Sequence, residues 1–122
     1  MAKKILIIDD EINVTTITRV RLELEGYQVK YAYTAETGLE KLMSEPFDLL
    51  LLDVVLPDVD GCTLARQIRS HPALKDLPII LFTAGKIKDL EQRVREIGVN
   101  DSLQKPFDKE TLLTKVKNII GS

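Results

Sequence analysis

Apolar residues along the chain fall into two alternating patterns: short unbroken runs, and longer segments in which apolar positions recur every three or four residues. A short unbroken run is typical of a buried strand, whereas the wider spacing is typical of a helix. Runs of strand character occupy residues 5–8, 27–33, 49–52 and 79–82, with a weaker one at 102–104. The sequence therefore predicts strands in these five places.

Each short run is followed by a segment with helical spacing. The first helix is indicated by Ile17, Val20 and Leu24 and ends at Gly26. The second begins after Thr34, whose side chain suits a helix N-terminus. Further helices are expected where apolar positions recur, at residues 64–68, 87–97 and 112–120.

Strands that alternate with helices predict a particular fold class. Right-handed crossovers between successive strands build a parallel sheet, so we expect a doubly wound α/β domain with helices on both faces. The four leucines at 49–52 indicate a strand buried on both sides. The turn residues Pro57, Asp58 and Gly61 follow, so this strand must end near Asp53.

The overall composition fits one globular domain and excludes several other classes. The length of 122 residues suits one domain, so we expect residues 1–122 to form a single unit with no effector domain. A net charge of −2 gives no electrostatic case for direct binding to nucleic acid. The lone Cys62 excludes an internal disulfide, and no apolar run approaches the roughly 20 residues of a membrane span. These features predict a cytoplasmic protein that does not bind membranes.

Polar side chains follow four of the predicted strands. Asp9 and Asp10 come after the first strand, Asp53 closes the third, and Thr83 and Lys105 follow the fourth and fifth. The carboxyl ends of parallel strands lie at one edge of a sheet, where open α/β sheets bind ligands. Three adjacent carboxylates repel one another unless a divalent cation lies among them, and oxygen ligation with open water positions favours Mg²⁺. With a lysine and a hydroxyl to hold phosphoryl oxygens, the set predicts phosphoryl transfer onto an aspartate.

Each of these residues also has an ordinary structural explanation. An aspartate after a strand commonly caps the next helix, Lys105 alone would be a solvated surface lysine, and Thr83 alone a strand-end hydroxyl. The functional interpretation depends on all of them meeting at one edge of the sheet.

In combination, these motifs resemble the receiver domain of response regulators, the phosphoacceptor module of two-component signalling. The resemblance covers essentially the whole chain. It implies a flavodoxin-like sheet with strand order 2-1-3-4-5. The motifs that carry it are residues 7–11 (Ile-Ile-Asp-Asp-Glu), Asp53 with residues 56–61 (Leu-Pro-Asp-Val-Asp-Gly), Thr83 with Ala84, and Lys105 with Pro106 and Phe107.

The resemblance also implies roles for the acidic residues. Asp53 would accept the phosphoryl group, while Asp9 and Asp10 would hold Mg²⁺ together with Asp53. The main-chain carbonyl of Val55 would complete the protein's share of the metal ligands. A histidine kinase or a phosphotransfer protein would be the donor. The receiver itself, a signalling switch rather than an enzyme, would promote both its phosphorylation and its dephosphorylation.

Further roles fall on the residues that follow the fourth and fifth strands. Thr83 would donate a hydrogen bond to the phosphoryl group, and Lys105 would pair with it. Ala84 would leave the site open to an incoming donor or water, and Pro106 would follow a cis peptide bond. Because Val55 has no polar side chain to orient attacking water, the phosphoaspartate is not expected to be unusually short-lived.

One position departs from the receiver pattern. Most receivers carry Tyr or Phe three residues before the lysine, as a ring that turns inward on activation, whereas this chain has Ser102. A serine can bury little apolar surface, so we expect the signal to pass through Thr83 and the loop at 84–86. The expected output face comprises the last two helices and the strand between them. Its mixed charge suits an output protein, an effector domain or a homodimer.

Four other functions compete with this interpretation. A haloacid-dehalogenase-type phosphatase requires a second acid two residues after its nucleophile, and Val55 stands there. A flavodoxin-like electron carrier needs a phosphate-binding loop after the first strand, where the acidic residues 9–11 would repel a flavin phosphate. No P-loop motif is present. The closest alternative is a receiver-like interaction module that no longer responds to phosphorylation, which only Ser102 favours.

Overall fold

A single parallel sheet organises the chain. The computed structural model describes residues 2–84 and 90–121, and within them five strands pair in the order β2-β1-β3-β4-β5. This strand order and the parallel pairing confirm the predicted fold class. The strands are β1 (Lys4–Ile8), β2 (Gln28–Ala32), β3 (Leu49–Asp53), β4 (Ile79–Ala84) and β5 (Asp101–Lys105).

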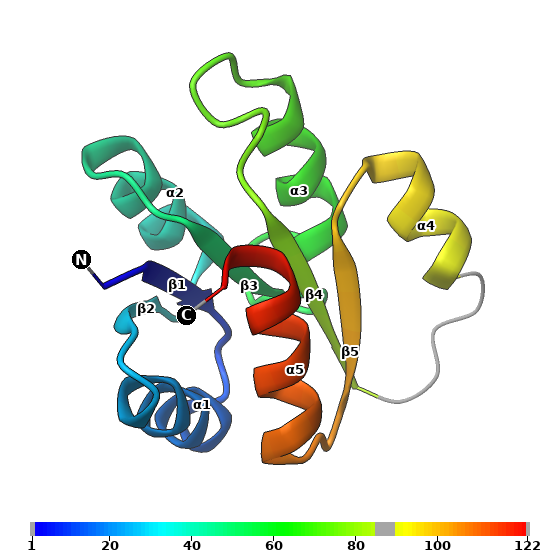
Figure 1. Cartoon of the computed structure of the whole chain (residues 1–122). Coiled ribbons are helices and arrows are strands. Elements are labelled where there is room, and N and C mark those ends of the chain that lie inside the picture. The colour runs from blue at the N-terminus through cyan, green and yellow to red at the C-terminus, as the bar shows by residue number, and fades with distance from the viewer. Residues whose placement is uncertain (1, 85–89, 122) are drawn as a thin grey trace.

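Helices cover both faces of this sheet (Figure 1). Helices α2, α3 and α4 pack on one face, and α1 and α5 pack on the other. In the described residues the helices are α1 (Ile12–Leu24), α2 (Ala35–Ser44), α3 (Gly61–Ser70), α4 (Leu90–Ile97) and α5 (Lys109–Ile120).

Strand β3 shows why the sheet is doubly covered. Each of its residues is buried, as the run of four leucines predicted. Because successive side chains of a strand point to opposite faces, Leu50 and Leu52 join the core under α2 and α3. Leu49 and Leu51 join the core under α1 and α5. The central strands are thus fixed from both sides, which holds their carboxyl ends in a defined register.

Helix α1 forms where it was predicted, but with an unexpected face toward the core. Ile17, Val20 and Leu24, which revealed the helix, are 51%, 44% and 76% exposed. The buried positions are instead Thr15, Thr18 and Leu22. The Thr15 hydroxyl donates to the Asp9 carbonyl at 3.3 Å, so a threonine can pack against the sheet with its polar group satisfied.

Residues 85–89 lie outside the described residues, and with them the start of the predicted fourth helix at Ile87 and the loop at Gly85 and Lys86.

Among the described helices none is long and apolar enough to cross a membrane, since the longest, α1, has 13 residues.

Candidate functional site

Three carboxylates meet at the carboxyl edge of the sheet. Ile8 of β1 pairs with Leu52 of β3, so the next residue of each segment, Asp9 and Asp53, lie side by side. Both are buried, whereas Asp10 is exposed. One carboxylate oxygen from each of the three lies within 4.8 Å of the others. The register of two neighbouring strands therefore builds the acidic cluster that the sequence predicted.

Lys105 reaches this cluster from the end of β5. Its ammonium lies 2.7 Å from Asp9 Oδ2, 3.1 Å from Asp53 Oδ2 and 2.9 Å from Glu11 Oε1. Only 9% of the lysine side chain is exposed. Burial, the largest single influence, would lower the pKa of Lys105, but hydrogen bonds to Asp9 and Glu11 together with the negative charges of Asp9 and Asp53 outweigh burial and raise that pKa above its ordinary value. The ammonium therefore stays charged and partly neutralises the carboxylates.

Asp53 carries a perturbed carboxyl group. Burial, and then repulsion from Asp9, raise the pKa of Asp53 to about 6. The Val55 N–H, which donates to Asp53 Oδ1 at 3.1 Å, and the ammonium of Lys105 oppose this rise but do not cancel it. Without further positive charge, the ionised form of Asp53 is thus disfavoured, although ionisation is what a nucleophilic carboxylate needs.

Glu11 contributes to the site although the sequence pattern predicts no role for it. It occupies the N-cap position of α1, yet its side chain makes no capping hydrogen bond and instead contacts Lys105. The only sequence signal was its place directly after the two aspartates, and such an exposed acid is common at a helix start. Its contact with a lysine 94 positions away could be seen only in the folded chain.

Thr83 lies on β4 beside the acidic cluster. Phe82 pairs with Asp53, and the Val54 N–H donates to the Phe82 carbonyl at 3.0 Å, so Thr83 stands one residue further toward the carboxyl edge. Thr83 is buried, and its hydroxyl has no hydrogen-bond partner among residues 2–84 and 90–121. Ala84, at the end of the strand, is exposed. Because buried polar groups are usually hydrogen-bonded, a buried hydroxyl that lacks a partner among these residues is well suited to donate to a bound ligand.

The remaining predicted site residues, Val55, Pro106 and Ser102, differ in how exposed they are and in how close they lie to the acidic cluster. Val55 sits in the loop after β3 with 67% of its surface exposed. The Lys105–Pro106 peptide bond is cis. Ser102 is half-buried within β5 and pairs with Leu81, three residues before Lys105, so it lies inside the sheet rather than at its acidic edge.

The donor set fits Mg²⁺. Its ligand atoms are oxygens, two of the three carboxylates are buried, and burial followed by repulsion from Asp9 raises the pKa of Asp53. Magnesium prefers oxygen ligands from one or two carboxylates and keeps several water molecules. An ion of this kind would relieve the repulsion between Asp9 and Asp53.

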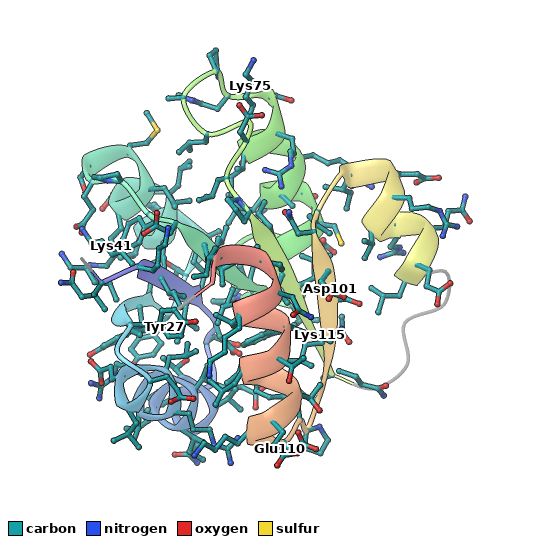
Figure 2. All side chains as sticks on the ribbon, viewed as in Figure 1. Tyr27, Lys41, Lys75, Asp101, Glu110 and Lys115 are labelled. Atoms are coloured by element: carbon teal, nitrogen blue, oxygen red, sulfur yellow. The ribbon has the colours of Figure 1, made fainter. Side chains whose placement is uncertain are left out.

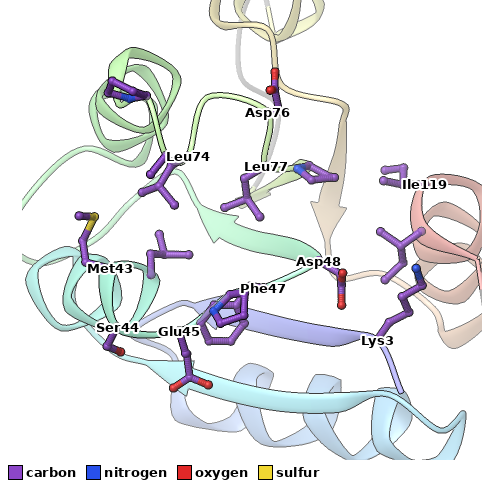
Figure 3. A pocket seen from close by; sticks show the side chains of 16 residues that line it. Lys3, Met43, Ser44, Glu45, Phe47, Asp48, Leu74, Asp76, Leu77 and Ile119 are labelled. Carbon is purple, nitrogen blue, oxygen red and sulfur yellow. The ribbon is translucent and has the colours of Figure 1, made fainter. Parts of the chain in front are cut away.

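A separate groove of about 750 Å³ lies at the opposite, amino-terminal end of the sheet (Figure 3). Its lining includes Lys3, Asp48 and Pro78, which precede β1, β3 and β4. Leu77 and Phe47 contribute apolar surface. Because these residues stand at the strand starts, the groove is distinct from the acidic cluster at the strand ends.

Comparison with known proteins agrees with this geometry. The family model of the response regulator receiver domain matches residues 5–117. The response regulator ArlR of Staphylococcus saprophyticus is 39% identical over 119 residues, which are 96% of this chain and 52% of that protein. The chain thus spans about half the length of the curated relatives it matches.

Solved structures with the same fold include chemotaxis protein CheY4 of Vibrio cholerae, at 28% identity and a TM-score of 0.91 over 98% of this chain and 99% of that one. Another is the receiver domain of the sensor histidine kinase PA1611 from Pseudomonas aeruginosa, which has a magnesium ion coordinated in its active-site cleft. It is 28% identical, with a TM-score of 0.89, and all of both chains is covered. Fold, acidic edge and family match agree, and the chain belongs to the response regulator receiver domain family.

Proposed function

We propose that this receiver is a switch in which Asp53 accepts a phosphoryl group from a histidine kinase or a phosphotransfer protein in a Mg²⁺-dependent reaction. An Asp53 oxygen forms a bond to phosphorus as the phosphorus–nitrogen bond of the donor phosphohistidine breaks. The imidazole leaves and takes up a proton. The receiver promotes this transfer and the later hydrolysis without being an enzyme in the ordinary sense.

One observation carries this proposal: Asp53 is buried beside both a second carboxylate and a lysine. Asp53 Oδ1 is held by the Val55 N–H, and Oδ2 is held by the ammonium of Lys105 at 3.1 Å. Asp9 and Asp10 would hold Mg²⁺ with Asp53 and the Val55 carbonyl. Such an ion would keep Asp53 ionised and would neutralise the charge of the transferring phosphoryl group.

Lys105 and Thr83 would then bind the new phosphoryl group. Lys105 contacts Asp9 and Asp53 at once, so a cation among the carboxylates would free its ammonium for a phosphoryl oxygen. The Thr83 hydroxyl, which has no hydrogen-bond partner among residues 2–84 and 90–121, would donate to a second oxygen. Ala84 carries only a methyl group, which leaves access for the donor.

The surface that binds the output partner would be formed by α4, β5 and α5. Figure 2 shows Lys115 of α5 close to Asp101 of β5, and their charged atoms are 2.9 Å apart. With Ser102 in place of an aromatic ring, movement of Thr83 toward the phosphoryl group would act on the segment that leads from β4 to α4. The changed face would then alter binding to an output protein, an effector domain or a second copy of the chain.

A phosphorylation-independent interaction module is the second candidate. Ser102 favours it, because a serine cannot provide the apolar movement of an aromatic switch. The buried charges of Asp9, Asp53 and Lys105 argue against it, since paired buried charges cost folding energy and this arrangement has no evident use without phosphorylation.

Intact mass spectrometry after incubation with acetyl phosphate tests the proposal. We expect one added phosphoryl group with Mg²⁺ and none with EDTA. Asp53→Asn should remove the adduct, while Asp76→Asn, which changes an exposed carboxylate near the other end of the sheet, should keep it. Absence of an adduct on the unaltered chain despite bound Mg²⁺ would favour the interaction module.

A further inference from the structure

The loop between β3 and α3 is tied to a helix that has no residue in the acidic cluster. Asp58 lies in this loop, and its two carboxylate oxygens accept hydrogen bonds from the Ala35 and Glu36 N–H groups, each at 3.0 Å. Ala35 and Glu36 are the first two residues of α2. These same two bonds hold the pKa of Asp58 below its ordinary value, as expected for a carboxylate at a helix N-terminus.

The other end of the same loop carries atoms of the proposed metal site. The Val55 N–H donates to Asp53 Oδ1, and the carbonyl of Val55 is a proposed Mg²⁺ ligand. The loop closes on itself where Gly61 N donates to the Val54 carbonyl at 2.7 Å and where Val55 pairs with Asp60. This closure fixes the base of the loop, and the contact of Asp58 with α2 fixes its tip.

We infer that Asp58 is a positioning residue that sets the Mg²⁺ affinity of the site by holding the Val55 segment against α2. This inference rests on the proposed function and deepens it, because it names an anchor outside the acidic cluster. The anchor is rigid on both sides: α2 packs on the sheet through Ala35 and Leu42, and Asp58 contacts its backbone rather than a flexible side chain.

The structure supplies a way to separate this role from ordinary helix capping. Thr34 caps the same terminus of α2, since its hydroxyl accepts from the Thr37 N–H at 3.1 Å. Loss of either side chain therefore leaves N–H groups of α2 unpaired and weakens the helix. Only loss of Asp58 also releases the loop. Glu36 offers a further control, because it is an exposed carboxylate at the same helix end.

Isothermal titration calorimetry with Mg²⁺ measures the affinity directly, without phosphorylation. Partners outside the first ligand shell commonly change metal affinity by roughly 10–100-fold, so we expect Asp58→Ala to weaken Mg²⁺ binding about tenfold. Asp58→Asn, which keeps one acceptor oxygen, should fall between this variant and the unaltered chain. Thr34→Ala and Glu36→Gln should stay within about twofold of the unaltered chain, the first as the helix control and the second as the charge control.

The rate of phosphorylation by acetyl phosphate gives a second readout. At limiting Mg²⁺ the rate of Asp58→Ala should fall, and saturating Mg²⁺ should restore most of it, because the nucleophile itself is intact. Equal Mg²⁺ affinity in Asp58→Ala and Thr34→Ala, or equal loss in Asp58→Ala and Glu36→Gln, would overturn the positioning role alone. An unaltered chain that binds no Mg²⁺ would overturn the proposed function as well.

Discussion

Asp53 stands in surroundings that oppose the negative charge required by its proposed role as phosphoacceptor. Burial and the neighbouring Asp9 raise its pKa to about 6, while Lys105 and the Val55 N–H only partly compensate. A cation placed among the carboxylates would reverse this balance, because it stabilises the ionised form. Metal binding and ionisation of this proposed nucleophile would therefore favour each other.

The raised pKa of Asp53 predicts how stability depends on pH in the metal-free protein. The carboxyl of Asp53 has a pKa of about 6 in the native state, whereas its ordinary value in the unfolded chain is 3.8. The native state therefore binds more protons than the unfolded state between pH 3.8 and pH 6. As pH rises through this window, the free energy of unfolding falls. Asp53→Asn avoids this loss. In urea denaturation with EDTA we expect it to raise the free energy of unfolding at pH 7 by roughly 2 kcal/mol.

The gain from Asp53→Asn should shrink as pH falls below about 6 and disappear near pH 3, below the ordinary pKa of 3.8, where both the native and the unfolded carboxyl are largely protonated. A difference that stays constant from pH 4 to pH 7 would contradict the assignment of the cost to ionisation of Asp53.

Thr83 gives a second prediction at the scale of one residue. Its buried hydroxyl lacks a partner among the described residues, so Thr83→Val removes a desolvation cost rather than a hydrogen bond. We expect the free energy of unfolding to stay unchanged or to rise by about 1 kcal/mol. After phosphorylation, the amide chemical shifts of β5 should change less than in the unaltered chain, because the phosphoryl group would lose its hydroxyl donor.

Thr15→Val is the matched comparison for Thr83→Val. Thr15 is also buried, but its hydroxyl donates to the Asp9 carbonyl, so its loss should cost about 1 kcal/mol of stability. An equal loss of stability in both variants would mean that the Thr83 hydroxyl is satisfied in the free protein.

At the scale of elements, the start of α3 is fitted closely against the end of β3. A Cβ at Gly61 would lie 2.8 Å from Val54 Cα and still closer to the Asp53 carbonyl oxygen. Both obstacles are backbone atoms and cannot turn away. We expect Gly61→Ala to destabilise the protein by roughly 3 kcal/mol in urea denaturation, and to impair phosphorylation by displacing Asp53.

Gly26→Ala separates steric displacement from backbone strain. Gly26 has a φ of +95°, with nothing within 4 Å of an added Cβ, so the substitution should cost only about 1–2 kcal/mol and leave phosphorylation intact. If Gly61→Ala behaved like Gly26→Ala in both measurements, the close approach to Asp53 would not be what requires glycine at position 61.

The order and type of the elements followed from the sequence because local pattern and global fold agree along most of the chain. Helix α1 shows where pattern alone fails. Its most regular apolar residues, Ile17 and Val20 among them, are exposed, while Thr15 and Thr18 face the core. A threonine carries a methyl group as well as a hydroxyl, so it can fill a core position that simple hydrophobicity assigns to solvent.

The sequence predicted those site residues whose position is set by the end of a strand. Asp9 and Asp53 could be assigned in advance to one edge of the sheet, because parallel strands end there. That β1 lies beside β3 was implied only by the resemblance to receiver domains, and the strand register confirms it. Glu11 and Asp58 could not be assigned, since each acts through a contact with a residue distant in sequence, Lys105 or α2. Nothing in a local pattern distinguishes such an acid from one that merely faces water.

At the scale of the whole molecule, the two cores share one sheet. Leu50 and Leu51 are neighbours in β3 and fully buried, yet they belong to opposite cores. A disturbance of either core must therefore displace the strand that carries Asp53. This arrangement explains how a site at one edge can be held rigidly by side chains that never touch it, since interiors are packed too densely to deform locally.

The shared sheet predicts that the two cores unfold as one unit. Leu50→Ala and Leu51→Ala should each cost roughly 3 kcal/mol, within the usual range for a buried leucine. Tyrosine fluorescence includes a signal from Tyr27, which is buried in the core of Leu51 and donates to the Gly121 carbonyl at 2.5 Å. If the cores are coupled, Leu50→Ala shifts the fluorescence and circular dichroism transitions in urea equally. A fluorescence transition that stays in place while circular dichroism shifts would mean that the α1 and α5 side unfolds independently.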